Sequence, residues 1–152
     1  FAEIAAAFPD VIIDGAIDRK SLGRDVFKRP EKRTLLEGIL HPMVREARQD
    51  WVRHHEAEGA ALVVLDVPLL YETGTEKSCD VVVVVSASPW QQRRRAMARP
   101  GMTEQKLDAI LDAQLDDAEK RRRADFVIPA NYGIGTSRWY VRRIIAVLTE
   151  RA

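Results

Sequence analysis

The chain has only one cysteine among its 152 residues. Cys79 therefore has no partner for an internal disulfide, and a zinc site built from several cysteines is excluded. Because nothing in the cysteine content points to an oxidising compartment, a cytoplasmic location is predicted.

Long apolar stretches and a strong charge of one sign are missing as well. The apolar runs at residues 60–67 and 81–85 are far shorter than the roughly 18 residues that a membrane-spanning helix needs, so no membrane association is predicted. The formal net charge is only +1. A general attraction to nucleic acid or anionic lipid is therefore not expected, and any basic function must come from local clusters of charge.

Glycine does not occur in the pattern that a phosphate-binding loop requires. None of the 8 glycines is followed by lysine, so the motif G-x-x-x-x-G-K-[ST] does not occur in the sequence. No strand signal opens the chain either, although a doubly wound sheet normally begins with one. The first strand and the phosphate-binding loop of such a fold are therefore predicted to be missing.

Apolar runs alternate with helical patterns over most of the chain. Residues 60–67 form a continuous apolar run rich in β-branched residues, which is typical of a strand covered on both faces in a parallel sheet. Residues 81–85 and 124–128 repeat this signal. Helices are predicted over residues 89–99, 103–114, 116–123 and 137–149. Strands separated by helices predict βαβ units and a parallel sheet, hence an α/β fold.

The first 58 residues differ from the rest because they have almost no strand signal. Helical patterns cover residues 18–27, 30–40 and 42–58. Pro30 suits a helix start, since proline at the first helical position loses no hydrogen bond. This part is predicted to be a helical insert.

Asp66 lies at the predicted C-terminal end of a buried strand, and an apolar turn that begins at Pro68 follows it. Ligands bind at this edge of open α/β sheets. Asp66 can hold Mg²⁺ there through water, while Pro68, Leu69 and Leu70 can line a pocket for an apolar substrate group. The alternative is that Asp66 caps the following turn and that the leucines belong to the core.

Arg95 and Arg99 are four residues apart and are predicted to share one helix face. The helical pair that follows contains Gln114 and Lys120. A hinged helical cover that carries arginines suits phosphoryl transfer, because positioned cations stabilise the charge on the phosphoryl oxygens. The alternative is a solvated basic helix.

His41 precedes Pro42 between two predicted helices. Such a histidine either caps or packs against a helix, or it binds a substrate. His54 and His55 have no metal-ligand partners at suitable spacing, and no side chain is predicted to bind a metal directly.

The order of these motifs is more informative than any one of them. From the N-terminus the chain carries Ile17-Asp18-Arg19, His41-Pro42, Asp66-Val67-Pro68-Leu69-Leu70-Tyr71-Glu72-Thr73-Gly74, Arg95-x-x-x-Arg99, Gly101-Met102-Thr103, Gln114 with Lys120, and Ala124-Asp125-x-Val127-Ile128. In this order they resemble the dephospho-CoA kinase family over essentially the whole chain.

The resemblance implies a three-layer α/β fold of the P-loop kinase type, with a helical substrate-binding insert and a helical lid. The substrate-binding part would be residues 1–59, the core residues 60–98 and 124–152, and the lid residues 99–123. The implied reaction is the phosphorylation of the 3′-hydroxyl of dephospho-CoA to give coenzyme A. Dephospho-CoA and ATP would be the partners, with Mg²⁺ as cofactor.

The resemblance also implies roles for single residues. Arg95 would reach the ATP phosphates as the catalytic arginine, and His41 would lie near the substrate. Pro68, Leu69 and Leu70 would line the acceptor site. The lid residues on the ATP side would be Arg99, Gln114 and Lys120, and Asp66 would be linked to Mg²⁺. Asn131 stands one place later than in the family's Ile-x-Asn pattern, so no adenine contact is assigned to it.

Without a phosphate-binding loop, the 152-residue chain by itself is predicted to have no kinase activity. Two other functions compete with this interpretation. One is a P-loop kinase that acts on another small molecule or a nucleotide. The other is a non-catalytic module that binds RNA through residues 93–99 and 120–123, which the near-zero net charge and the lack of interleaved aromatic residues disfavour. No oligomeric state is predicted.

Overall fold

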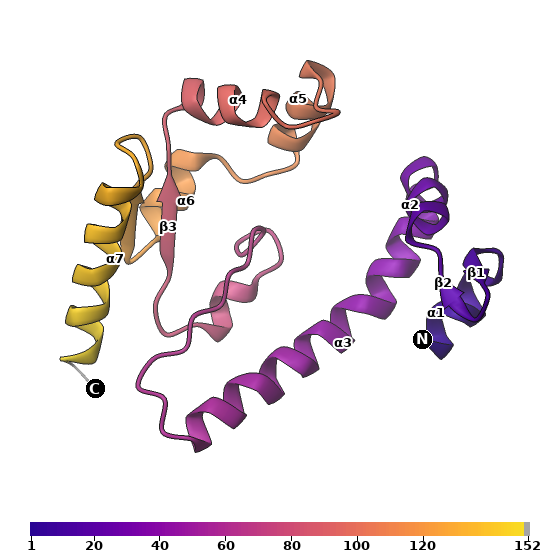
Figure 1. Cartoon of the computed structure of the whole chain (residues 1–152), viewed down its shortest axis with the longest axis horizontal. Helices are drawn as coiled ribbons and strands as arrows, with labels where there is room; N and C mark the ends of the chain where they lie inside the picture. The colour runs from indigo at the N-terminus through magenta and orange to yellow at the C-terminus, as the bar shows by residue number, and fades with distance from the viewer. Residues whose placement is uncertain (151–152) are drawn as a thin grey trace. The chain divides into compact units, whose positions relative to one another are not determined.

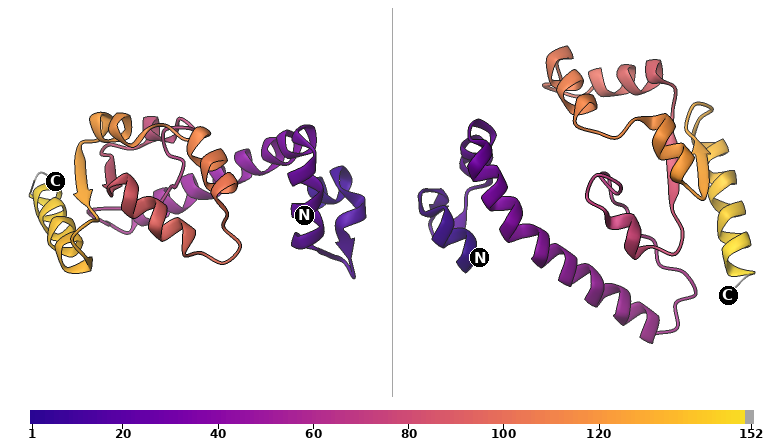
Figure 2. Two further views of the ribbon diagram at one scale, coloured as in Figure 1. Left: turned by 90° about the horizontal axis from the view of Figure 1, so that it is seen from above. Right: turned by 180° about the vertical axis from the view of Figure 1, so that it is seen from behind.

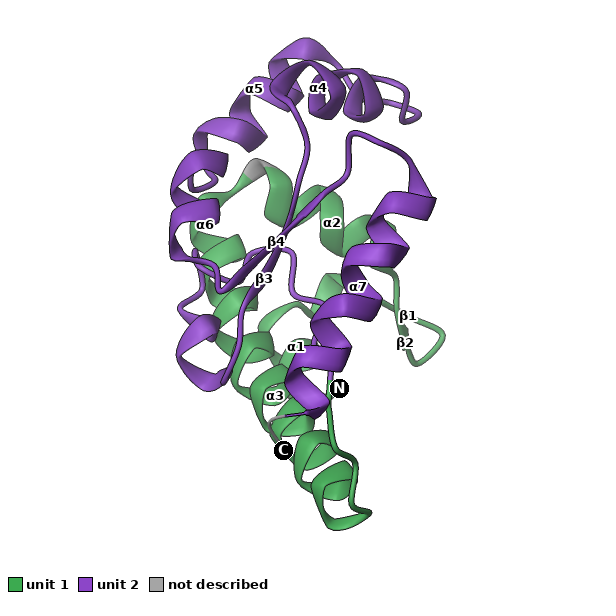
Figure 3. Ribbon diagram, turned by 90° about the vertical axis from the view of Figure 1, so that its left-hand side faces the viewer, with its two compact units in different colours: residues 1–63 green, residues 64–152 purple. Residues whose placement is uncertain are grey.

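The computed structural model describes residues 1–150, and of Lys28 only the backbone. Figures 1 and 2 show the helices and strands. In chain order they are α1 (Ala2–Ala7), the 3₁₀ turn η1 (Pro9–Val11), β1 (Ile12–Ile13), β2 (Ala16–Ile17), α2 (Arg19–Lys28), α3 (Pro30–Ala57), the 3₁₀ turn η2 (Thr75–Ser78), β3 (Val83–Ser86), α4 (Pro89–Met97), α5 (Glu104–Asp112), α6 (Asp117–Arg123), β4 (Phe126–Pro129) and α7 (Ile134–Thr149). The chain divides into two compact units, residues 1–63 and 64–152 (Figure 3).

The first unit has a small apolar core around its N-terminal segment. Ile4 and Phe8 of the α1 segment and Val11 of η1 are buried, with exposed fractions of 8%, 2% and 3%. Apolar side chains of α2 and α3 pack against them. These are Leu22, Val26, Leu36, Ile39 and Leu40. The amphipathic faces of two helices are thus held together by three buried residues that precede them.

A short antiparallel hairpin, β1 with β2, was not predicted from the sequence. Ile12 pairs with Ile17 and Ile13 with Ala16. The turn between them is Asp14-Gly15, and both residues have positive φ, 49° and 75°. This conformation matches the strand twist of a two-residue hairpin, and an Asp-Gly pair is a preferred sequence for it. The signal was therefore present, and the expectation of an all-helical first part is wrong in this detail.

Helix α3 is continuous, which corrects the prediction of two helices separated at His41-Pro42. It runs from Pro30 to Ala57, and Pro42 lies inside it. Proline lacks the N–H that would bond to the carbonyl four residues earlier, here that of Gly38. The loss of one hydrogen bond does not end the helix, because the turns on both sides keep theirs. The long helix ends before Gly59, whose φ of +79° is left-handed.

The second unit contains a parallel strand pair, as the alternation of strands and helices predicts. β3 pairs with β4 in a register that joins Val83 to Phe126 and Ser86 to Pro129. Directly before the two strands, the Asp125 carboxylate accepts a hydrogen bond of 2.8 Å from the Val82 backbone N–H. Helix α7 packs on β4 (Figure 1). Its Ile144 side chain is buried. Parallel strands flanked by helices place this unit in the α/β class.

The predicted strand at residues 60–67 is not a strand in the structure. The segment is assigned to neither a helix nor a strand, and it has no ladder partner among the described residues. Its side chains still alternate, since Val63, Leu65 and Val67 are half-buried while Leu62 and Val64 are exposed. A strand is defined by hydrogen bonds to a neighbour, so apolar alternation alone does not make one. The sheet of the described residues accordingly has two parallel strands rather than the expected larger sheet.

The remaining helices lie close to their predicted positions. Helix α5 begins after Thr103, whose side chain accepts a hydrogen bond from the Lys106 N–H, and α6 begins after Asp116, whose side chain accepts one from the Ala118 N–H. Helix α7 begins at Ile134, earlier than the predicted residue 137. None of the described helices is both long enough and apolar enough to cross a membrane.

Candidate active site

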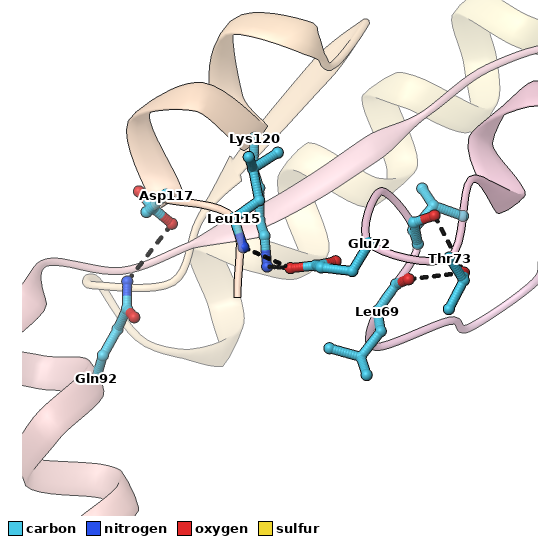
Figure 4. A network of polar contacts seen from close by, with 8 residues as sticks. Leu69, Glu72, Thr73, Gln92, Leu115, Asp117 and Lys120 are labelled. Atoms are coloured by element: carbon cyan, nitrogen blue, oxygen red, sulfur yellow. Dashed lines mark hydrogen bonds and ion pairs between the residues drawn. The ribbon is translucent and has the colours of Figure 1, made fainter. Parts of the chain in front are cut away.

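The segment that begins at Pro68 forms a helical turn. The Thr73 N–H donates to the Leu69 carbonyl over 3.1 Å, and the Thr75 N–H donates to the Leu70 carbonyl over 2.9 Å. The Thr73 hydroxyl also donates to the Leu69 carbonyl, over 2.8 Å (Figure 4). Gly74 ends the turn in a left-handed conformation with φ of +67°. We call residues 68–74 the proline-led turn.

The alternative interpretation places the leucines of the proline-led turn in the core. The structure does not, because these side chains are in contact with solvent. Leu69 is 42% exposed, Pro68 is exposed and Leu70 is half-buried. Apolar side chains held on a hydrogen-bonded turn and left in contact with solvent provide a surface for an apolar group of a ligand.

Glu72, in the same turn, binds two donors from the segment around α6. Its Oε1 atom accepts a hydrogen bond from the Leu115 backbone N–H and forms an ion pair with Lys120 Nζ, both at a distance of 2.8 Å (Figure 4). The Glu72 and Lys120 side chains are only 17% and 18% exposed. Burial alone would raise the pKa of Glu72, but the Lys120 ammonium and the backbone donors outweigh it and lower that pKa. The carboxylate is therefore charged at neutral pH.

A second contact joins the proline-led turn to α6. The Arg123 guanidinium lies over the Tyr71 ring, 5.8 Å from its centroid. Burial and the Asp125 carboxylate raise the pKa of the Tyr71 phenol, with Arg123 acting in the opposite direction. The turn is thus attached to α6 by an ion pair and an aromatic contact, and to Leu115, just before α6, by a backbone hydrogen bond.

Asp66 lies near the end of the segment at residues 60–67, and its side chain is exposed. Its carboxylate accepts no hydrogen bond from the following turn among the described residues, so the hypothesis that it caps this turn is wrong. In the same described part of the chain, no group of three or more histidine, cysteine, aspartate or glutamate side chains lies close enough to hold a metal ion.

At the carboxyl end of β3, a buried serine fixes the start of α6. Ser86 is 8% exposed, and its hydroxyl donates to Asp117 Oδ2 over 2.7 Å. Gln92 makes a longer contact of 3.5 Å with the other carboxylate oxygen of Asp117 (Figure 4). Helix α6 is therefore attached to the sheet as well as to the proline-led turn.

The carboxyl end of β4 is fixed to α4. Asn131 Oδ1 accepts a hydrogen bond of 2.8 Å from the Ser88 N–H, and Gln91 donates to the Asn131 carbonyl over 3.2 Å. Arg95 donates from a terminal guanidinium nitrogen to the Ala130 carbonyl over 2.7 Å, and its side chain is otherwise exposed. The Arg95 guanidinium therefore lies at the edge of the parallel sheet where ligands of α/β folds bind.

Known proteins resemble this chain over most of its length. The model of the family described as dephospho-CoA kinase matches residues 1–135. The dephospho-CoA kinase of Rhizobium etli is 47% identical over 148 residues, which cover 97% of this chain and 73% of that protein. That of Rhodopseudomonas palustris is 49% identical over 142 residues, or 93% of this chain and 71% of that protein.

The chain belongs to the dephospho-CoA kinase family.

Solved structures agree with the assignment to this family. A crystal structure from Thermus thermophilus superimposes with a TM-score of 0.78 at 33% identity, covering 96% of this chain and 74% of the other. The dephospho-CoA kinase of Campylobacter jejuni gives a TM-score of 0.72 at 27% identity, covering 97% and 76%. The prediction of an α/β kinase that converts dephospho-CoA to coenzyme A is confirmed by this membership.

Two residues that the sequence assigned to the lid of this kinase lie outside helices. Arg99 was expected to share a helix face with Arg95, but α4 ends at Met97 and Arg99 follows it. The reason is Pro100, because a residue that precedes proline is disfavoured in the helical conformation. Gln114 follows α5, and its N–H donates to the Leu111 carbonyl in the closing turn. Arg95 and Arg99 are therefore not on one helix face.

His41 belongs to the other unit, inside α3, and its side chain is exposed. It neither caps a helix nor packs in a core, so the two structural interpretations of this histidine are wrong. Within the same unit, an open hollow of about 570 Å³ lies along one face of α2. Its lining residues are Arg19, Lys20, Gly23, Arg24 and Phe27.

The contacts just described also include residues to which the sequence gave no role. Glu72, Asp117 and Asn131 each join segments that are distant in sequence. Glu72 carries a signal that could have been used, namely a charge directly after an apolar turn. Asp117 and Asn131 give no such signal, because their partners are decided by the fold.

Proposed function

We propose that the family reaction, transfer of a phosphoryl group from ATP to dephospho-CoA, is divided among three parts of this chain. The proline-led turn would hold the acceptor, Arg95 would bind the phosphates, and residues 99–123 would form the lid over ATP. The position of the Arg95 guanidinium at the carboxyl edge of the parallel strand pair carries this assignment.

Arg95 is the catalytic residue of this proposal. Its contact with the Ala130 carbonyl holds one end of the guanidinium and leaves the remaining N–H donors for phosphoryl oxygens. Charge builds on those oxygens in the transition state, and a positioned guanidinium stabilises it. A planar fork with several donors suits this task better than the point charge of lysine.

Pro68, Leu69 and Leu70 would line the acceptor site. Their partly exposed apolar surface is held in place by backbone hydrogen bonds to Thr73 and Thr75. A fixed wall of this kind can orient the acceptor hydroxyl for in-line attack, and orientation is a large part of catalysis when two substrates react.

The lid of the proposal contains Arg99, Gln114 and Lys120. Helix α5 at its centre is joined to α4 by ion pairs from Arg93 to Glu104 and Asp108, the latter with an N–O distance of 3.1 Å. Arg99 and Gln114 lie in the turns on either side of α5, where a lid needs freedom to move.

The helical unit would bind the remainder of dephospho-CoA. The α2 hollow is lined by three cationic side chains, Arg19, Lys20 and Arg24, beside the exposed ring of Phe27. The diphosphate of dephospho-CoA is an anionic group that such a hollow suits. The exposed His41 would contact the same substrate.

Mg²⁺ is implied by the chemistry of ATP. This ion usually keeps several of its waters and is bound through one or two carboxylates and the substrate phosphates. The exposed Asp66 carboxylate would hold a water of that ion. When bound, Mg²⁺ would neutralise phosphate charge, and no other residue of the described chain is assigned to it.

The proposal is tested in an enzyme in which residues 1–152 follow the N-terminal segment of the Rhizobium etli kinase, called the joined enzyme below. We expect the joined enzyme to phosphorylate dephospho-CoA with ATP, and the 152-residue chain alone to show no turnover. Coupled ADP release would be measured with dephospho-CoA and with a panel of nucleosides and nucleotides. Turnover of a nucleotide but not of dephospho-CoA would refute the proposal in favour of another P-loop kinase.

A further inference from the structure

Glu72 stands out among the ion-paired residues of the described chain. Its pair with Lys120 is the one in which both side chains are less than one-fifth exposed. The other ion pairs of the described residues each have at least one partner more exposed than this, and several join residues three or four positions apart on one helix. Glu72 and Lys120 instead join a turn to a helix that is distant in sequence.

Both of its donors come from one place, the C-terminal part of the proposed lid, after helix α5. The Leu115 N–H and Lys120 Nζ each lie 2.8 Å from the same carboxylate oxygen (Figure 4). Leu115 comes directly after Gln114, at the point where the lid helix α5 has ended. The carboxylate therefore holds the downstream end of the lid at two positions.

The same short segment is attached to the sheet by another side chain. Asp117 accepts from the buried Ser86 hydroxyl at the carboxyl end of β3 over 2.7 Å. Residues 115–120 are thus held between the strand end, near which Arg95 lies, and the turn that carries Pro68 to Leu70. Two parts that the proposed function gives to different substrates meet at these contacts.

On this basis we infer that Glu72 is a positioning residue of the kinase reaction, which sets the lid end and the acceptor turn at a fixed separation. The inference rests on the proposed function. Glu72 touches neither substrate in it. Glu72 acts indirectly. Its bonds to Leu115 and Lys120 position the end of the lid, and its own backbone belongs to the turn that positions the acceptor.

Substitutions can separate the two bonds of Glu72. Glu72→Gln keeps an oxygen that can accept from the Leu115 N–H but removes the charge that holds Lys120. Lys120→Met removes the ammonium and keeps an apolar chain. Glu72→Ala removes both bonds. Asp50→Asn is the matched control, because Asp50 pairs with Arg53 on its own helix, α3, and both lie outside the proposed lid and the proline-led turn.

Measured in the joined enzyme, Glu72→Gln should lower kcat about 10-fold and Glu72→Ala about 100-fold, since a displacement of about 1 Å can cost that much in an aligned reaction. The KM values for ATP and dephospho-CoA should each stay within about threefold. The double variant Glu72→Gln/Lys120→Met should be no slower than Glu72→Gln, because both changes remove one shared contact. Asp50→Asn should keep kcat within about twofold.

Different outcomes overturn different statements. An unmodified joined enzyme that fails to phosphorylate dephospho-CoA overturns the proposed function and this inference with it. An active joined enzyme in which Glu72→Ala matches Asp50→Asn in kcat overturns the inference alone. A Lys120→Met variant that raises only the KM for ATP, with Glu72→Gln at the parental kcat, also overturns it, because Lys120 would then act directly on ATP. A thermal melt of each variant identifies loss of folding. If Asp50→Asn lowered kcat as much as Glu72→Gln at an equal melting temperature, the positioning role would also be overturned.

Discussion

Each of the two units of the molecule is stabilised internally by a different kind of contact. In residues 1–63, the side-chain hydrogen bonds of the described residues link positions at most seven apart, and an apolar core of Ile4, Phe8 and Val11 joins the helices. In residues 64–152, several hydrogen bonds link positions 31 to 43 apart.

This difference shows where precise geometry is located. A surface that binds a large substrate can be built on helices that pack through a few apolar contacts. Binding needs a suitable charge and shape of the surface, and not the exact placement of single atoms. Phosphoryl transfer needs groups from several segments at set distances, and long-range hydrogen bonds supply these. The residues proposed for catalysis and the acceptor site belong to the second unit, whereas His41 and the α2 hollow belong to the first.

The largest expected effect tests the second unit. Arg95→Ala in the joined enzyme should lower kcat by roughly 10³-fold or more, because one positioned arginine is worth about 10³ to 10⁵ in related phosphoryl transfers. Arg95→Lys should recover little of this, since lysine lacks the planar fork. Steady-state turnover of dephospho-CoA would measure both. A folded Arg95→Ala enzyme within tenfold of the parent would remove Arg95 from the site.

The next effect tests the apolar core of the first unit. Phe8 is 2% exposed, so Phe8→Ala should lower the free energy of unfolding by about 3 kcal/mol through lost burial and the cavity left behind. Chemical denaturation would measure this change. Phe27→Ala is the control, because Phe27 is 84% exposed and its loss should change stability by less than about 0.5 kcal/mol. Equal effects of the two substitutions would contradict the core described here.

A smaller effect is expected at His41. His41→Ala should raise the KM for dephospho-CoA about tenfold and leave the KM for ATP unchanged, because a contact with one substrate affects that substrate alone. The melting temperature should not fall, since the side chain is exposed within α3. His54→Ala, at another exposed position of the same helix, should change neither KM. An unchanged KM for dephospho-CoA in His41→Ala would exclude His41 from the substrate site.

The smallest effect is expected from alanine substitutions at two helical glycines, Gly23 and Gly38, which serve as a matched pair. A Cβ atom at Gly23 or Gly38 would meet no other atom within 4 Å, so alanine at either position should stabilise its helix by about 0.5 to 1 kcal/mol. Only Gly23 lines the α2 hollow, so only Gly23→Ala should raise the KM for dephospho-CoA, by about threefold. Thermal melts and kinetics of both variants measure the comparison. Equal KM values would argue against a ligand in the hollow.

The sequence determined the features that depend on neighbouring residues. The helices around Asp18, Thr103 and Asp116 begin where a capping side chain is available, and the motif order identified the family. The Asp14-Gly15 hairpin was also encoded locally, although its strands of two residues are too short for a periodic pattern. Local signals are legible because they need only backbone propensity and hydrogen bonds within a few residues.

Only the tertiary structure decided the contacts that assemble the candidate site. The sequence could not show that Glu72 would bind Lys120 and Leu115, that Asp117 would hold Ser86, or that Arg95 would meet the Ala130 carbonyl. The segment at residues 60–67 has the composition of a strand and yet has no ladder partner among the described residues. Each of these outcomes depends on which distant segment lies alongside, and hydrogen bonds between distant segments leave no periodic trace in the sequence.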